Sequence, residues 1–231
     1  MICKCVAGAG ILIAALLAAS PAPGEDRDIV NGTDRDDVIF GDLGQFPGEG
    51  LLGDGGLSAS LRALDTRELR EIGRMLEGKN GIEGPGDTAD VIHGGAGDDI
   101  IFGQGGNDAI DAGPGRDIVF AGSGNDCIMF DPEDRFIDGG SGIDVLVAGP
   151  DAPSLRTLKE KGTVWNIEVL LVLDDTPLLK RVQGIRIEDD KVVLDATVWK
   201  TDTARTGIYV SQDGSASRLE VDSGVEIVWG L

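Results

Sequence analysis

Seven nine-residue units follow one another without a gap from Pro85 to Val147: PGDTADVIH, GGAGDDIIF, GQGGNDAID, AGPGRDIVF, AGSGNDCIM, FDPEDRFID and GGSGIDVLV. The eighth residue of every unit is a large aliphatic one: Ile92, Ile101, Ile110, Val119, Ile128, Ile137 and Leu146. The sixth residue is Asp in six units, Asp90, Asp99, Asp108, Asp117, Asp126 and Asp144, and Arg135 in the remaining one. The fourth residue is Gly in five units. A period that holds at three positions predicts a repeat architecture.

Each unit divides into a turn and a short strand. Glycines in the first six residues allow the positive φ angles and close backbone approach of a tight turn. The last three residues, such as Ile100 to Phe102, suit a strand, because β-branched and aromatic side chains fit a pleated surface. Stacked units would then bury a row of position-eight side chains between two sheets, with two units in each coil.

The units resemble the RTX (repeat-in-toxin, hemolysin-type) nonapeptide, G-G-x-G-x-D-x-U-x with U large and aliphatic, over about a quarter of the chain. The resemblance implies a right-handed parallel β-roll that binds calcium. The expected fold is therefore mainly β: a β-roll over residues 24–150 with a helical insertion at about 45–84, and a β-rich C-terminal capping region over residues 151–231.

Stacking brings the carboxylates together, with Asp90, Asp108, Asp126 and Asp144 on one side of the roll and Asp99 and Asp117 on the other. Neighbouring carboxylates repel unless a cation neutralises them. Ca²⁺ accepts six to eight oxygens in flexible geometry, whereas Mg²⁺ demands a tight octahedron. We therefore expect several Ca²⁺ ions, held by these six carboxylates, by Asp37 and by turn carbonyls. The glycines expected to contribute to the turns are Gly95, Gly97, Gly113, Gly115, Gly122 and Gly124.

Two alternatives stay open for the repeats: solvated polar turns, and a β-solenoid that needs no ion. Arg135 should weaken a site between Asp117 and its own unit, and Asp134 or Glu133 would partly compensate.

The N-terminal segment, residues 1–23, resembles a secretory signal peptide. A 14-residue apolar run from Val6 to Ala19 follows Lys4, and small residues near Ala19 suit cleavage. The run is short for a membrane-spanning helix, although an uncleaved anchor is the alternative. The mature chain is expected to be secreted and extracellular, with the periplasm or the cell surface as alternatives, and without a stable membrane span.

A further repeat, Gly32 to Phe40, precedes the tandem units and has Asp37 and Ile39 at positions six and eight. It predicts an N-terminal rung of the same roll, interrupted by the insertion. Within the insertion, residues 57–77 have helical spacing of apolar residues, with a capping box at Asp65 and Glu68 and a C-cap at Gly78. This helix is expected to cover the roll, and a partner-binding helix is the alternative.

After Val147 the period ends. A short helical run over residues 154–161 is expected, followed by strands at 163–173, 182–188, 191–199, 206–211, 217–221 and 225–229. The three tryptophans, Trp165, Trp199 and Trp229, lie here as core or cap residues, or as a sugar-binding platform.

The formal charge of −21 argues against nucleic acid and anionic membranes as partners. Cys127 remains alone if the signal peptide is removed, so no disulfide framework is expected. The chain has no H-E-x-x-H and no G-x-S-x-G motif, and its one histidine, His93, flanks a strand. The first hypothesis is thus a non-enzymatic, secreted calcium-binding module with an unknown extracellular or cell-surface partner. The second is a secreted enzyme or carbohydrate-binding protein with its site in the C-terminal region.

Overall fold

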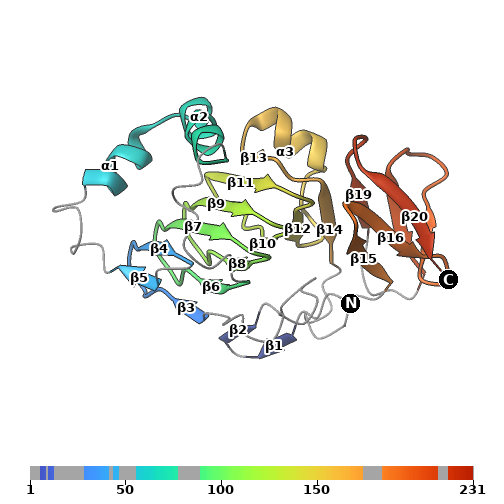
Figure 1. The fold of residues 1–231 in the computed structure, drawn as a ribbon, viewed down its shortest axis with the longest axis horizontal. Coiled ribbons are helices and arrows are strands. Elements are labelled where there is room, and N and C mark those ends of the chain that lie inside the picture. The colour runs from blue at the N-terminus through green and yellow to red at the C-terminus, as the bar shows by residue number, and fades with distance from the viewer. Residues whose placement is uncertain are drawn as a thin grey trace.

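The computed structural model describes residues 6–8, 10–12, 29–41, 44–46, 56–77, 89–173, 184–212 and 218–230. The tandem units form the centre of the molecule, and their strands alternate between two parallel sheets (Figure 1). One sheet contains β6 (Val91–His93), β8 (Ala109–Asp111), β10 (Cys127–Met129) and β12 (Val145–Ala148). The other contains β7 (Ile100–Gly105), β9 (Ile118–Ser123) and β11 (Phe136–Ser141). The predicted parallel β-roll is confirmed.

The strand register shows that two units make one coil. Ile92 pairs with Ile110 in one sheet, and Ile101 pairs with Val119 in the other. Position eight of each unit therefore stacks on position eight of the unit two further on, as the period predicts.

The N-terminal rung is also confirmed. β3 (Ile29–Asn31) pairs with β6, and β4 (Val38–Phe40) pairs with β7, both parallel. Val30 and Ile39 thus stand in line with Ile92 and Ile101. β5 (Gly44–Phe46) then turns back antiparallel on β4. It covers the edge that β4 would otherwise leave unpaired.

At the extreme N-terminus, β1 (Val6–Gly8) and β2 (Gly10–Leu12) form an antiparallel pair within the predicted signal peptide. The small residues of its expected cleavage region, residues 18–22, lie outside the described part of the chain. Across the ranges that the structure describes, no helix is both long enough and apolar enough to cross a membrane.

The insertion holds two helices where one was expected: α1 (Gly56–Ala63) and α2 (Thr66–Glu77). The break falls at the predicted capping box. The backbone amide of Asp65 donates to Oε2 of Glu68, and the amide of Glu68 donates to Oδ1 of Asp65, both at 2.8 Å. Reciprocal bonds of this kind begin a helix, so the box starts α2. Gly78, the expected C-cap, lies outside the described residues.

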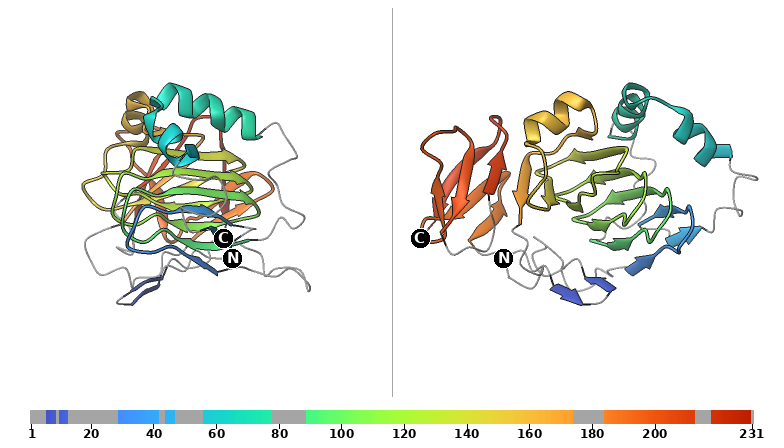
Figure 2. Two further views of the ribbon diagram at one scale, coloured as in Figure 1. Left: turned by 90° about the vertical axis from the view of Figure 1, so that its left-hand side faces the viewer. Right: turned by 180° about the vertical axis from the view of Figure 1, so that it is seen from behind.

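Both helices cover the outer face of the sheet that contains β7, β9 and β11 (Figure 2). A row of aromatic rings crosses this face, with neighbouring ring centroids between 4.9 and 5.6 Å apart: Phe40, Phe102, Phe120 and Phe136. Leu61 of α1 and Leu69 of α2 are buried against these rings. The predicted covering role of the insertion is confirmed for Leu61 and Leu69.

Beyond the tandem units, α3 (Leu155–Lys161) begins where it was expected, with Ser154 as its N-cap. The single strand expected over residues 163–173 is wrong. The chain instead forms β13 (Val164–Trp165) in one sheet and β14 (Val169–Val172) in the other. The reason is a turn at Asn166, whose φ of +46° interrupts an extended strand.

The C-terminal strands belong to two different sheets. β17 (Trp199–Thr201), β18 (Ile208–Ser211) and β19 (Arg218–Val221) continue the roll sheet beyond β14, now antiparallel. β15 (Ile185–Glu188), β16 (Lys191–Asp195) and β20 (Glu226–Gly230) form a separate sheet. The strand expected over residues 191–199 ends at Asp195, so Trp199 begins the next strand instead.

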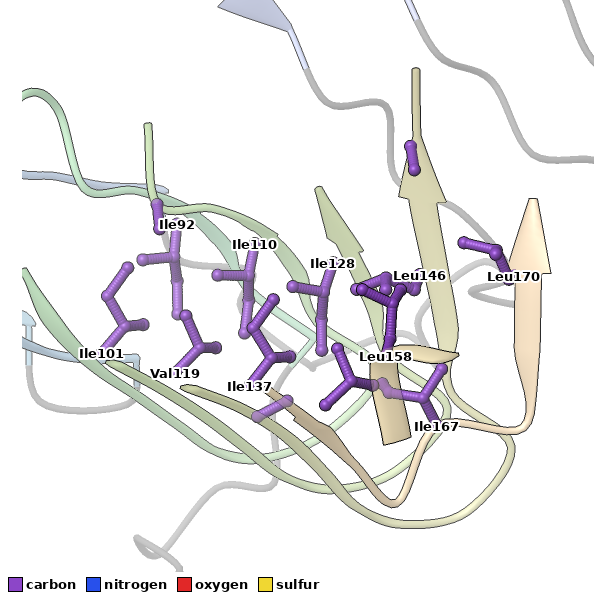
Figure 3. Close-up of a cluster of buried hydrophobic side chains, with 14 of the residues drawn as sticks. Ile92, Ile101, Ile110, Val119, Ile128, Ile137, Leu146, Leu158, Ile167 and Leu170 are labelled. Atoms are coloured by element: carbon purple, nitrogen blue, oxygen red, sulfur yellow. The ribbon is translucent and has the colours of Figure 1, made fainter. Parts of the chain in front are cut away.

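Three apolar clusters hold these layers together. The inner cluster lies between the roll sheets, where the position-eight side chains face one another (Figure 3). A second cluster lies under α1 and α2. A third lies between the extended roll sheet and the β15–β16–β20 sheet, and contains Cys127, Trp199 and Val192. Cys127 is a free, fully buried thiol that packs in this third cluster.

We predict that Ile110→Ala lowers the free energy of unfolding by about 3 kcal/mol, because Ile110 is fully buried in the inner row and the remaining cavity collapses only in part. Urea unfolding of the calcium-loaded protein measures the change. Ile29→Ala is the matched control, since Ile29 is 69% exposed on an edge strand, and it should stay within about 0.5 kcal/mol of the wild type. Equal losses in the two variants would contradict the assignment of the inner core.

Candidate metal centre

The sixth-position carboxylates form two ladders of hydrogen bonds that run from coil to coil. In each ladder, one carboxylate oxygen accepts a bond from the backbone amide of the equivalent residue in the preceding coil. The first ladder has the pairs Asp90 to Asp108, Asp108 to Asp126 and Asp126 to Asp144, all at 2.8 Å. The second has Asp37 to Asp99 at 2.8 Å and Asp99 to Asp117 at 2.7 Å. The predicted grouping of these residues on two sides of the roll is confirmed.

The second carboxylate oxygen, Oδ2, is the atom of these residues that is available to a metal ion. Asp99, Asp117, Asp126 and Asp144 are all fully buried. Within the described part of the chain, Oδ2 of each of these four residues is buried without a hydrogen-bond partner. Leaving a buried anionic oxygen unpaired costs several kcal/mol. The arrangement therefore favours a cation beside these atoms.

Backbone carbonyls converge on the same places. A Cβ added to Gly94 would lie 2.6 Å from Oδ2 of Asp99 and 2.3 Å from the carbonyl oxygen of Ala112 in the next coil. A Cβ added to Gly103 would meet Oδ2 of Asp108 and the carbonyl oxygen of Ala121 at the same two distances. At Gly94 and Gly103 the first glycine of the unit thus leaves open a cradle lined by one carboxylate and one carbonyl oxygen.

This donor set fits calcium better than a transition metal. All donors are oxygens, half of them from the backbone, and they come from two successive coils. Hard cations such as Ca²⁺ prefer such ligands. No group of three or more His, Cys, Asp and Glu side chains within the described ranges could hold a metal by side chains alone.

Comparison with known families agrees with this geometry. The model of the RTX calcium-binding nonapeptide repeat matches the chain in four copies, over residues 24–45, 86–119 and 105–132. The chain carries RTX repeats. The match at residues 24–45 includes the N-terminal rung, which the structure also places in the roll. No curated protein matches the chain, and no solved structure does.

The predicted RTX glycines stack coil upon coil. Added Cβ atoms at Gly113 and Gly115 would lie 1.9 and 1.7 Å from the carbonyl oxygens of Gly95 and Gly97. Gly122 and Gly124 approach the carbonyls of the preceding coil equally closely. Such distances exclude any side chain, so these positions bring backbone oxygens of successive turns together.

Asp37 of the N-terminal rung differs from the tandem carboxylates. Its Oδ2 accepts hydrogen bonds from the backbone amide of Thr33 at 2.6 Å and from the Thr33 hydroxyl at 2.8 Å. The carboxylate is thus already satisfied by its own turn. The protein itself therefore compensates part of the charge of Asp37.

The turn with Arg135 departs from the RTX pattern in a specific way. The Arg135 guanidinium donates to the backbone carbonyls of Arg62 and Leu64, at the end of α1. Asp134 is buried, whereas Glu133 is exposed. Burial, with a smaller contribution from the nearby charge of Asp117, raises the pKa of Asp134 to about 8. Of the two residues expected to compensate, Asp134 is the one beside Asp117.

Burial also shifts the ladder carboxylates. It raises the pKa of Asp99 to about 6 and that of Asp117 and Asp126 to about 7, although backbone amide donors oppose the shift. Burial raises the pKa of Asp144 as well, and the charge of Asp126 adds to the effect. In the absence of a cation, the folded roll therefore retains protons that the unfolded chain has lost.

We predict that acidification stabilises the metal-free protein and reduces the additional stability that calcium gives. Because the folded pKa values lie above the ordinary value of 3.8, the metal-free roll gains stability as the pH falls from 8 to 5. Protons and calcium compete for the same oxygens, so the difference in Tm between the two forms should narrow over this range. Thermal unfolding followed by circular dichroism tests both points. A metal-free Tm that falls steadily with acidification would contradict this account.

Proposed function

We propose that the protein is a secreted, non-enzymatic calcium-binding module whose β-roll folds when Ca²⁺ bridges successive turns. The observation that carries the proposal is the set of four fully buried Oδ2 atoms, on Asp99, Asp117, Asp126 and Asp144, that have no hydrogen-bond partner within the described residues. The RTX repeats support calcium as the ion.

Coupling between binding and folding follows from the position of these atoms. In the unfolded chain the carboxylates are hydrated and far apart, so only the roll brings them together with the turn carbonyls. A ligand that binds only the folded state stabilises it, by about 2.7 kcal/mol for each site at a concentration of 100 times Kd. Several sites in one stack would then decide whether the roll folds.

The setting proposed is outside the cytoplasm. The predicted signal peptide supports export, and the proposed export would bring the chain to calcium concentrations that fill sites of millimolar-range affinity. There the module would have a structural or interaction role with an extracellular or cell-surface partner. The acidic surface supports neither nucleic acid nor anionic membranes as partners.

The alternative of a C-terminal catalytic or sugar-binding cleft has less support. It required Trp165, Trp199 and Trp229 to line one cleft. Trp165 lies with the cluster under the helices, beneath the guanidinium of Arg70 at 3.8 Å. Trp199 is buried in the C-terminal cluster, and Trp229 packs edge-on against Tyr209. Trp165 and Trp199 thus belong to different apolar clusters, and Trp199 is too deeply buried to line an open cleft.

The direct test is far-UV circular dichroism of the mature chain during a calcium titration from a chelated start, with magnesium as the control ion. We expect a cooperative gain of β signal with calcium but not with magnesium, because Mg²⁺ requires a tight octahedron and retains its water. An unchanged, already folded spectrum, together with no calcium binding by calorimetry, would refute the proposal.

We predict that Asp126→Asn leaves the metal-free protein at least as stable as the wild type but reduces its stabilisation by calcium. The neutral amide removes the cost of burying a charge, so the metal-free variant should be at least as stable as the wild type. Asp126 takes part in two consecutive ladder pairs, so the stabilisation by saturating calcium should fall by about 3 kcal/mol. Asp151→Asn is the control, because it removes the same charge from an exposed position outside the nonapeptide units. Equal calcium responses in both variants would contradict a role for Asp126 in the site.

A further inference from the structure

The roll continues for one coil beyond the last nonapeptide. β13 pairs with β11 in parallel, with Val164 beside Ile137. β14 pairs with β12 in parallel, with Leu170 beside Leu146. Val164 and Leu170 are both fully buried in the inner cluster, as position-eight residues are. The sequence of this coil does not follow the nonapeptide, yet its strands occupy the same places.

The turn of this extra coil is shorter than a repeat turn. Between the paired strands, the preceding coil has the six residues Gly139 to Asp144, whereas the extra coil has only Asn166, Ile167 and Glu168. Asn166 has a φ of +46°, and Ile167 is buried in the inner cluster. The backbone therefore closes the turn with half the usual number of residues.

Glu168 nevertheless takes the place of the sixth-position aspartate. Its Oε2 accepts a hydrogen bond from the backbone amide of Asp144 at 3.0 Å, where Asp144 itself accepts one from Asp126 at 2.8 Å. The amide of Val169 donates to the carbonyl of Asp144 at 3.0 Å, as the amide of Val145 does to Asp126 at 2.8 Å. The additional methylene of glutamate extends its reach in a turn that has lost three residues.

The oxygen cradle is repeated as well. A Cβ added to Gly139 would lie 2.6 Å from Oδ2 of Asp144 and 2.1 Å from the carbonyl oxygen of Asn166. The corresponding distances at Gly94 and Gly103 are 2.6 and 2.3 Å. Asp144 is fully buried, and its Oδ2 has no hydrogen-bond partner within the described residues. An unpaired, buried oxygen thus faces this cradle, as in the tandem repeats.

We propose that Asp144, Glu168 and the carbonyl oxygen of Asn166 form a further divalent-cation site, selective for Ca²⁺, outside the nonapeptide sequence. The inference rests on the proposed function of the repeats. Lys159, whose positive charge acts on Glu168, forms an ion pair with Asp222 at 2.5 Å. Its charge is thus shared with a second carboxylate, and the cradle beside Asp144 still lacks a counter-ion.

The site would join the roll to the C-terminal strands. The backbone carbonyl of Glu168 accepts a hydrogen bond from the amide of Asp222 at 2.8 Å. β14, which follows Glu168, pairs with β19. A cation bound here would fix the turn from which the C-terminal sheet continues, so calcium would order that region as well as the repeats.

Counting bound ions tests the proposal. Equilibrium dialysis against radioactive calcium at saturation gives the number of ions per chain for the wild type and for Glu168→Gln. The glutamine can still accept the bond from Asp144 but has no charge, so we expect one fewer ion. The control is Glu160→Gln on α3, an exposed glutamate paired with Arg156, which should leave the number unchanged. An equal number of ions in Glu168→Gln and the wild type would overturn the proposal.

A second variant covers the case in which Glu168→Gln does not fold. Glu168→Asp retains the charge but is one methylene shorter. We expect one site to weaken by about tenfold while the others keep their affinity, and an unchanged binding curve would overturn the proposal. Calcium binding by the wild type distinguishes failure of the proposed function from failure of the Glu168 site alone. If it binds no calcium, the proposed function itself fails. If it binds calcium and both variants behave as the wild type, only the Glu168 site fails.

Discussion

The structure depends on how the sixth-position carboxylates are shared between coils. One oxygen of each carboxylate fixes the backbone of the preceding coil, as Asp126 does for Asp108 at 2.8 Å. Where the unit begins with glycine, as at Gly94 and Gly103, the other oxygen lies beside the space that this glycine leaves open. Each of these carboxylates thus serves both the register of neighbouring coils and the oxygen-lined site beside them. The inner row of Ile and Val side chains then packs because the turns hold it in line, and it stabilises the turns in return.

The contacts of the insertion explain the role of the one tandem unit that has arginine at its sixth position. At the sixth place of its unit, Arg135 replaces a carboxylate and binds the carbonyls of Arg62 and Leu64 at the end of α1. A cation near the last carbonyls of a helix is favourable, because those groups have no partner within the helix and carry partial negative charge. This turn therefore lacks the usual aspartate, and its arginine instead anchors the helices that cover the row of phenylalanines. Asp134, one residue earlier, keeps a buried carboxyl beside Asp117.

The sequence predicts the roll, its two-unit coil and the N-terminal rung, because Asp, Gly and Ile recur at fixed spacing. It placed the capping box at Asp65 and Glu68, but not the helix break that this box creates. It treated residues 163–173 as one strand, because the apolar run hides the turn at Asn166. Glu168 was missed for the same reason. Its role follows from the sheet register, since no nonapeptide spacing leads to it, and only the pairing of Val164 and Val169 with the preceding coil shows that its turn is short.

The end of the repeats is thus a gradual change of pattern within one sheet. β14 belongs to the roll by its parallel pairing with β12, and to the C-terminal region by its antiparallel pairing with β19. On its outer side, Leu171 packs in the same cluster as Trp199 and Val192. A strand shared in this way couples the roll to the C-terminal region, because it cannot shift in the roll without disturbing the C-terminal core. The position of β14 explains why a non-repeating end can stabilise a solenoid whose last coil would otherwise present unpaired edges and exposed apolar side chains.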